Sequence, residues 1–295
     1  MSVSNPPPGT PAAPTGSLVG RLLLRGMLAG LIAGLFAFAV AYVVGEPSVN
    51  ASIAVEEAAA AAQAEHSGQA GHAAHAEHAP SAHDHGADGA ATQADAEEEI
   101  VSRDLQSTAG LATGVLVYGV ALGGIASLAF CFVLGRVGRF SAKATAALVA
   151  AAAFTTVYLV PFLKYPATPP AVGNPDTIGK RTTLFFLMIL LSVLLGVAAV
   201  IAGRRLAPRL GNWNATVVAG AGFAAAVAIA CAVLPANGDA VKADFPAAVL
   251  WDFRLATLGI QAGLWVVFGL AFGLLAERLL APKPAAREAV PAPAA

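Results

Sequence analysis

Long runs of apolar residues that contain no charged side chain dominate the chain. Six runs contain 19 to 31 residues each, and a helix needs about 20 apolar residues to cross roughly 30 Å of hydrocarbon. The runs are Gly26 to Val44, Leu105 to Gly135, Ala144 to Leu163, Thr182 to Gly203, Leu210 to Gly238 and Leu255 to Ala276. Neither of the two longest runs has a central turn signal, so each is expected to form one span plus a flanking segment. The pattern predicts an all-α, polytopic integral membrane protein with about six transmembrane helices, and five is the alternative.

The polar positions divide the rest of the chain. We expect a disordered Pro-rich cytoplasmic tail, a first transmembrane helix, a disordered His/Ala/Glu-rich extracytoplasmic loop, a five-helix transmembrane domain and a disordered Pro/Ala tail. The predicted bounds are 1–17, 18–45, 46–104, 105–280 and 281–295. Within the loop, Val55 to Gln63 is Ala-rich enough to be helical, whereas the His-bearing part, interrupted by Gly68, Gly71 and Pro80, is expected not to be.

Composition agrees with a membrane protein. The 295 residues are 57% hydrophobic and 12% charged, against about 25% charged in an average soluble domain. The net charge of −1 leaves no basic block for nucleic acid. Cys131 and Cys231 both lie in apolar runs, which excludes a disulfide framework or a CxxC site.

Charge distribution predicts the orientation. With the N-terminus inside, 11 of the 17 basic residues fall on the cytoplasmic side of six spans, as the positive-inside rule favours. Both termini are then cytoplasmic. The first run is longer than the roughly 7 to 15 residues of a signal-peptide core, so a retained signal anchor is favoured over a cleaved signal.

Glycines recur at helical spacing within the spans. Gly26, Gly30 and Gly34 share one helix face, which allows close contact with another helix. The same spacing recurs as Gly119 and Gly123, Gly259 and Gly263, and Gly269 and Gly273. Coincidence in an Ala/Gly-rich chain is the alternative for each pair.

All the histidines of the protein lie in the segment between the first two spans. They are His66, His72, His75, His78, His83 and His85. Neutral imidazole is the commonest metal ligand in proteins, and neighbouring carboxylates can complete a mixed shell. With no thiolate or thioether present, the ligand set favours Co²⁺, Ni²⁺, Zn²⁺ or Cu²⁺ and does not choose among them. Polar filler in a low-complexity loop is the alternative. Binding in a Gly-rich loop would be weak, because each site must be ordered before it binds.

Two outer-face segments are candidates for a pore mouth. The first, from Pro161 to Asp176, carries five prolines and is expected to be extended rather than helical. The second opens the last span with a charge pair. Their polar side chains are Lys164, Tyr165, Asn174, Asp176, Asp252 and Arg254. Interfacial anchoring is the alternative reading of both segments.

The spans themselves contain no Asp, Glu, Lys, Arg or His at their centres. A carboxylate proton relay, a histidine-ligated haem and an intramembrane protease dyad are therefore not available, and no enzymatic activity or permanently bound cofactor is expected. Ions would have to pass other groups, such as the hydroxyls of Thr155, Thr156 and Thr257 or the amide of Gln261.

Two runs of sequence carry a family resemblance. The stretch VPFLKYPATPPAVGNPDTIGKR, the later FPAAVLWDFRLATLGIQ, and an N-terminal span followed by a His-rich loop resemble the CbtA family of predicted cobalt transporter subunits. The similarity extends from about Arg21 to Ala276. It implies a bacterial inner-membrane protein that supplies cobalt for corrinoid synthesis beside a small, single-span, His-bearing partner, CbtB.

These observations lead to a functional hypothesis. The chain is expected to be a membrane subunit of a cobalt uptake transporter, in which the outer His-rich loop captures the ion. A nickel or zinc permease is one alternative, and a non-transporting metal-binding or assembly subunit is another. No ATP-binding P-loop occurs, so energy must come from a partner or an ion gradient.

Overall fold

The computed structural model describes residues 17–73, 102–172, 177–236, 241 and 245–281. All regular structure in these residues is helical. The elements are α1 (Leu18–Val40), η1 (Ala41–Gly45), α2 (Glu46–Ala73), α3 (Arg103–Leu105), η2 (Gln106–Gly110), α4 (Leu111–Val133), α5 (Ala142–Ala153), η3 (Phe154–Leu159), α6 (Val160–Lys164), η4 (Pro170–Val172), α7 (Ile178–Val233) and α8 (Ala247–Leu280). The segments η1, η2 and η3 are π-helical, and η4 is a 3₁₀ turn.

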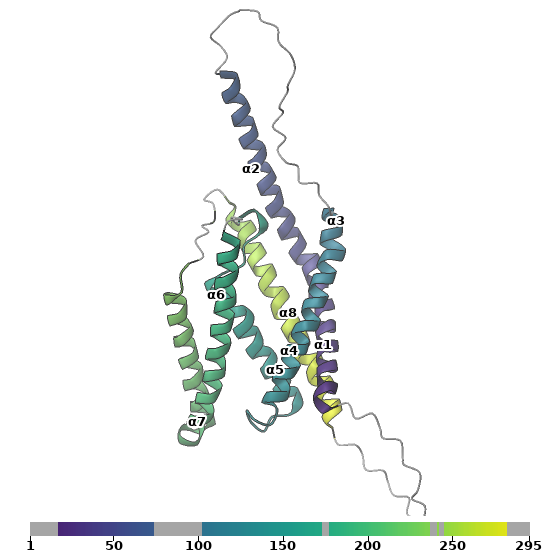
Figure 1. Ribbon diagram of the computed structural model, residues 1–295, viewed down its shortest axis with the longest axis vertical. Helices are drawn as coiled ribbons and strands as arrows, with labels where there is room; N and C mark the ends of the chain where they lie inside the picture. The colour runs from purple at the N-terminus through teal and green to yellow at the C-terminus, as the bar shows by residue number, and fades with distance from the viewer. Residues whose placement is uncertain (1–16, 74–101, 173–176, 237–240, 242–244, 282–295) are drawn as a thin grey trace, which may run out of the picture.

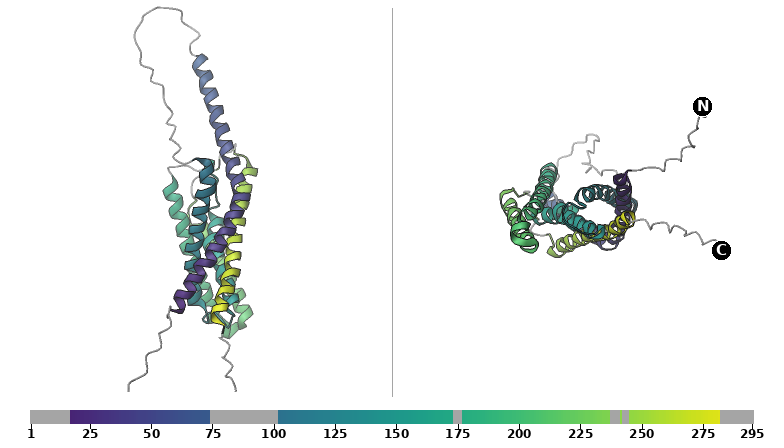
Figure 2. Two further views of the ribbon diagram at one scale, coloured as in Figure 1. Left: turned by 90° about the vertical axis from the view of Figure 1, so that its right-hand side faces the viewer. Right: turned by 90° about the horizontal axis from the view of Figure 1, so that it is seen from below.

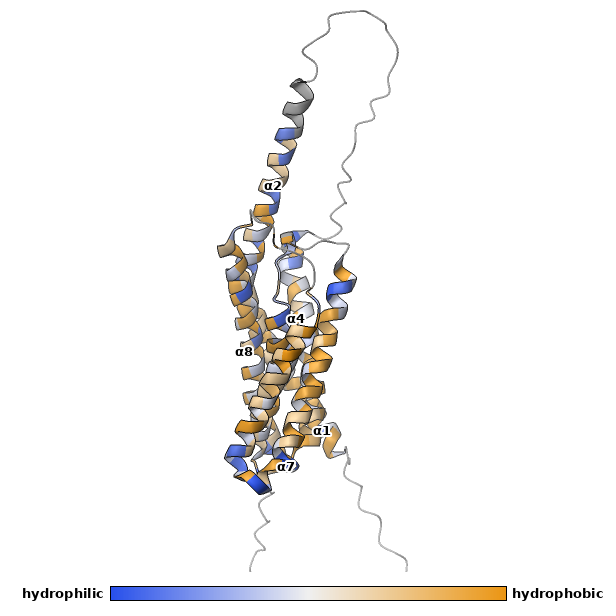
Figure 3. Cartoon of the chain, turned by 90° about the vertical axis from the view of Figure 1, so that its left-hand side faces the viewer, coloured by the Kyte–Doolittle hydropathy of each residue, from blue (hydrophilic) through white to orange (hydrophobic). Residues whose placement is uncertain are grey.

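Five helices in the described chain are long and apolar enough to cross a membrane. Figure 3 shows hydrophobic residues along the shared length of the bundle and hydrophilic residues at its ends and on α2. Helices suit this environment, because every backbone polar group in hydrocarbon must be bonded within its own segment. The expected all-α membrane architecture is confirmed.

The closest helix contact in the molecule joins α1 to α4. A Cβ atom added to Gly30 would lie 2.2 Å from the carbonyl oxygen of Gly119, and one added to Gly123 would lie 2.3 Å from that of Gly26. Only hydrogen fits at these positions, so the two backbones touch directly. The predicted contact face of α1 is therefore confirmed, with the α4 glycines as its partner.

The helix α8 completes a four-helix core with α1, α4 and α5. Gly269 and Gly273 bring α8 against α5, where an added Cβ would meet Ala150 and Lys143. The predicted pair of Gly259 and Gly263 does not bring two backbones together. A Cβ added to Gly263 would meet the Phe36 ring, and nothing lies within 4 Å of one added to Gly259. Aromatic rings fill the core: Phe130, Phe268 and Phe272 are each at most 2% exposed.

The 56-residue helix α7 turns back on itself at Gly211. This residue has φ of +79°, a conformation that glycine adopts without a side-chain clash. The two halves pack antiparallel, since Gly203 lies against Ala219 and Gly196 lies near Phe223. Figures 1 and 2 show this hairpin at one side of the four-helix core, next to α6. The sequence predicts two separate runs here, and the break lies at the start of the second.

The first helix is longer than the sequence predicts. The chain stays helical from α1 through η1 and on to the end of α2 at Ala73. The expectation of a non-helical His-bearing part is therefore wrong for residues 64–73. Residues 64–73 extend an existing helix, α2, in which 10 of the 28 residues are alanine. Because the helix is already formed, these residues extend it without a nucleation cost. The helix propensity of alanine then outweighs the lower propensity of Gly68 and Gly71.

A second correction concerns Pro161, which was expected to end the third span. It lies instead in the first turn of α6, and the helix continues to Lys164. The preceding π-helical turn η3 shifts the hydrogen-bond register of the helix, so that Pro161 occupies a position where no backbone N–H donor is needed. The N–H of Tyr165 then bonds the Pro161 carbonyl and ends the helix.

The glycine contact leads to a prediction. Gly119→Ala places a methyl group 2.6 Å from the Gly30 carbonyl oxygen, so we expect a loss of about 1–3 kcal/mol from overpacking. The thermal midpoint of the purified protein in detergent measures it. Gly114→Ala on the same helix is the control, because nothing lies within 4 Å of that position. Equal midpoints for the two variants would contradict the contact.

Candidate functional site

The histidines lie at and beyond the end of α2. His66 is exposed on this helix, which projects beyond the end of the bundle opposite the start of α1 (Figure 1). His72 lies in its last turn, and His75, His78, His83 and His85 lie outside the described residues. Within the described ranges, no three His, Cys, Asp or Glu side chains gather as a ligand group. Metal capture by this segment therefore stays a prediction.

An ion pair joins the two ends of the His-bearing segment. Arg103, at the start of α3, pairs with Glu46 at the start of α2. The same guanidinium donates a hydrogen bond to the Asn50 side chain (3.1 Å). Glu46 is only 14% exposed, so this pair is better shielded from water than a surface salt bridge. The start of α3 therefore lies beside the first turns of α2, at the two described ends of the His-bearing segment. Nothing in the sequence marks Arg103 and Glu46 as partners.

Two of the predicted pore-mouth residues bind the end of α7. The Lys164 ammonium donates a hydrogen bond to the carbonyl oxygen of Cys231 (2.7 Å), in the last turn of α7. The Tyr165 hydroxyl donates one to the carbonyl oxygen of Pro235 (2.8 Å). Burial raises the pKa of the Tyr165 phenol, which further favours the protonated form that donates this bond. Both side chains fasten α6 to the α7 hairpin.

The predicted charge pair of the second segment, Asp252 and Arg254, forms no ion pair in the described residues. Arg254 donates a hydrogen bond to the carbonyl oxygen of Ala167 (3.3 Å) and lies over the Trp251 ring. Asp252 is exposed and forms no ion pair within the described ranges. The pair does not open the helix as expected, because α8 begins five residues before Asp252, at Ala247. Asn174 and Asp176 lie outside the described residues.

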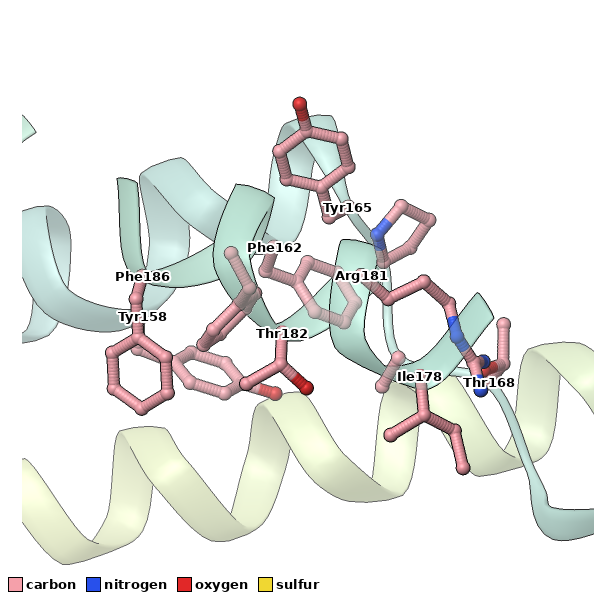
Figure 4. A pocket seen from close by; sticks show the side chains of 11 residues that line it. Tyr158, Phe162, Tyr165, Thr168, Ile178, Arg181, Thr182 and Phe186 are labelled. Atoms are coloured by element: carbon pink, nitrogen blue, oxygen red, sulfur yellow. The ribbon is translucent and has the colours of Figure 1, made fainter. Parts of the chain in front are cut away.

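A cavity of about 380 Å³ adjoins Tyr165 and Ala167. The lining residues come from η3, α6, the segment that follows α6, and the first three turns of α7. Its polar side chains include Tyr158, Arg181 and Thr182, none of which the sequence singles out. Figure 4 shows the Tyr165 hydroxyl directed away from the other lining residues, which agrees with its bond to Pro235.

The polar groups that the sequence places inside the spans differ in their hydrogen bonding. Thr155 and Thr156 donate to carbonyl oxygens of their own helix (2.8 and 2.9 Å). The Thr156 carbonyl in turn accepts from Ser192 of α7. Gln261 lies about two turns beyond Arg254 on α8, and its buried amide oxygen has no hydrogen-bond partner among the described residues.

Together these features define a polytopic helical membrane protein in which Lys164, Tyr165 and Arg254 form hydrogen bonds near the end of α6 and the start of α8. No curated protein and no solved structure matches the chain. One family model does match, over residues 19–277, and its description is "Probable cobalt transporter subunit (CbtA)". The match covers most of the chain, so this protein belongs to the CbtA family. Membership implies a subunit of a cobalt transporter, with Co²⁺ as the transported substrate.

The hydrogen bond from Lys164 to the end of α7 leads to a prediction. Lys164→Met keeps the apolar stem but removes the donor to Cys231, and a lost hydrogen bond from a charged group costs about 1.5–3 kcal/mol. Hydrogen exchange of backbone amides in residues 227–234 should therefore speed up. Lys180→Met, which alters an exposed lysine, is the control. Unchanged exchange in Lys164→Met would mean that the bond does not hold the hairpin.

Proposed function

We propose that this chain is the membrane permease subunit of a bacterial cobalt uptake system and that it catalyses no chemical reaction. The observation that carries the proposal is the family match over residues 19–277, because it includes all the apolar helices. The system would serve cobalamin synthesis from the inner membrane. A small single-span, His-bearing CbtB-like subunit is the proposed partner, and the energy would come from a partner or an ion gradient.

The proposed topology has six crossings, because α7 supplies two antiparallel passes on either side of Gly211. The starts of α1 and α5, the ends of α4 and α8, and the bend of α7 would then share one side. Nine described basic residues lie at that end: Arg21, Arg25, Arg136, Arg139, Lys143, Arg204, Arg205, Arg209 and Arg278. The positive-inside rule assigns this end to the cytoplasm and both termini with it.

The six histidines are proposed to concentrate Co²⁺ above the outer end of the bundle. The Arg103 pair to Glu46 supports this role, because it returns the segment to the surface that the ion would enter. Neutral imidazole binds Co²⁺, Ni²⁺ and Zn²⁺ alike, so the residues leave a nickel or zinc permease as the second candidate.

Replacing all six histidines with alanine tests the capture role. We expect the Co²⁺ concentration for half-maximal uptake to rise at least about threefold with the maximal rate unchanged, since saturating metal makes local concentration redundant. Uptake is measured against Co²⁺ concentration in cells that express each form. At low Co²⁺, uptake by the original chain should also fall below about pH 6.5, where imidazole is protonated, and that fall should vanish in the variant.

Three other outcomes of this experiment are informative. Loss of uptake even at saturating Co²⁺ would make the histidines obligatory ligands of the path. No uptake by the original chain, with or without its partner, would favour a non-transporting metal-binding or assembly subunit. Stronger competition by Ni²⁺ or Zn²⁺ than by unlabelled Co²⁺ would reassign the metal.

The topology has its own test. A cysteine introduced at Gly86 should react with a membrane-impermeant thiol reagent in intact cells, because the His-bearing segment is proposed to be extracytoplasmic. A cysteine introduced at Arg205, in the bend of α7, is the matched control and should react only after lysis. The opposite pattern would invert the orientation.

A further inference from the structure

Four uncharged polar side chains lie near one another within the apolar length of the bundle; Tyr118 is 41% exposed and the other three are half-buried. Tyr118 comes from α4, Tyr158 from η3, and Thr257 and Gln261 from successive turns of α8. The Gln261 amide lies within reach of the Tyr118 hydroxyl, and Thr257 lies within reach of the Tyr158 hydroxyl. Figure 4 shows the Tyr158 hydroxyl directed toward α8. We refer to these four residues as the oxygen cluster.

The hydrogen bonding of the oxygen cluster is incomplete. The Thr257 hydroxyl donates to the Arg254 carbonyl (2.9 Å), which leaves it only lone pairs to offer. The Tyr158 hydroxyl and the amide oxygen of Gln261 are buried, and neither has a hydrogen-bond partner among the described residues. Natural proteins satisfy most buried polar atoms, so two unpaired oxygens in one cluster suggest a function.

Packing alone does not explain these residues. Phe and Leu in place of Tyr158 and Gln261 would keep the shape without the unpaired oxygens, and a membrane interior makes such polar atoms costly. Tyr158 also lies in a π-helical turn, a distortion that is frequent at functional sites. Its ring stacks between Phe154 and Phe162, which fixes the hydroxyl in place.

We propose that the oxygen cluster is a transit site for a divalent cation, which it contacts through neutral oxygens while the ion keeps part of its water shell. The proposal rests on the proposed transport function and places the ion path along α8, between α4 and η3. Neutral oxygens hold Co²⁺ less tightly than imidazole or thiolate does. Weak binding suits a conducting site, which the ion must also leave.

Two cations near this path, Lys164 and Arg254, are bonded away from it, while Arg181 lines the same cavity as Tyr158. The Lys164 and Arg254 head groups bind the carbonyl oxygens of Cys231 and Ala167, whereas the carboxylate of Asp252 is exposed on the outer part of α8. An ion that enters beside α8 would therefore pass an acidic side chain before it reaches the oxygens.

Uptake kinetics test the site. Tyr158→Phe removes one hydroxyl and keeps the ring stack, and Gln261→Leu removes the amide. Each should lower the maximal rate of Co²⁺ uptake by about tenfold, since each removes an oxygen that contacts every ion. Tyr42→Phe, which removes a hydroxyl from a half-exposed tyrosine near the outer end of the same bundle, is the matched control and should transport normally.

Tryptophan fluorescence reports binding without transport. Trp265 lies one turn beyond Gln261 on α8 and is 4% exposed. In purified protein that carries Trp213→Phe and Trp251→Phe, Trp265 is the only indole, and Co²⁺ should quench it saturably. Gln261→Leu should abolish this quenching. Gln261→Glu keeps the shape and adds a charge, so it should quench at lower Co²⁺ while transporting more slowly.

A failure of the proposed function and a failure of the proposed transit site give different results. No Co²⁺ uptake by the original chain, with its partner present, would overturn the proposed function. Normal uptake by the original chain together with normal rates in Tyr158→Phe and Gln261→Leu would overturn the site alone. If Tyr158→Phe or Gln261→Leu is not produced in cells, the Trp265 fluorescence of Gln261→Glu decides instead. Quenching by Co²⁺ that is the same in Gln261→Glu as with the original side chain would overturn the site as well.

Discussion

The direct backbone contact between α1 and α4 is the constraint on which the rest of the bundle depends. Glycines on both helices bring the two backbones into direct contact, and the buried Ser127 side chain of α4 lies against Gly26, so van der Waals packing holds the pair along its apolar length. The helix α8 then packs on α1, and α5 packs on α8 through Gly269 and Gly273. The buried hydroxyl at this seam, that of Ser127, is bonded to the Gly124 carbonyl of its own helix. The oxygen cluster lies elsewhere, on the polar side where α8 meets α4 and η3.

The α7 hairpin covers part of that polar side and is held differently. Its bonds to the core include those from Ser192 to Thr156, from Lys164 to Cys231 and from Tyr165 to Pro235. Two of the three lie at the outer end, so the hairpin is fastened beside the proposed entry of the ion. In lipid no hydrophobic force presses the hairpin onto the core, which gives these few polar contacts unusual weight. The same region contains the cavity lined by Tyr158 and Thr182.

The sequence predicts features that depend on local spacing and misses those that depend on long-range pairing. Apolar runs locate the helices, and the four-residue spacing of Gly26, Gly30 and Gly34 predicts the face that α4 covers. The local breakers Gly68 and Pro161 predict helix ends that the structure does not have, because an existing helix and a π-turn tolerate them. Glu46 and Arg103 are 57 positions apart, and nothing in either segment identifies the other as its partner. Tyr118 and Tyr158 look like any aromatic residue in an apolar run, so only the fold brings them to Gln261.

The central claim is that the ion crosses along the polar side of α8 and not through the α1–α4 seam. Cysteine accessibility tests it most directly, in a chain that carries Cys131→Ala and Cys231→Ala. Thr257→Cys should react with a small hydrophilic thiol reagent added from outside, and Co²⁺ should slow the reaction. Ala33→Cys, at a position in α1 that is 0% exposed, should not react. Reaction at position 33 with none at position 257 would contradict the claim and place the path on the other side of the core.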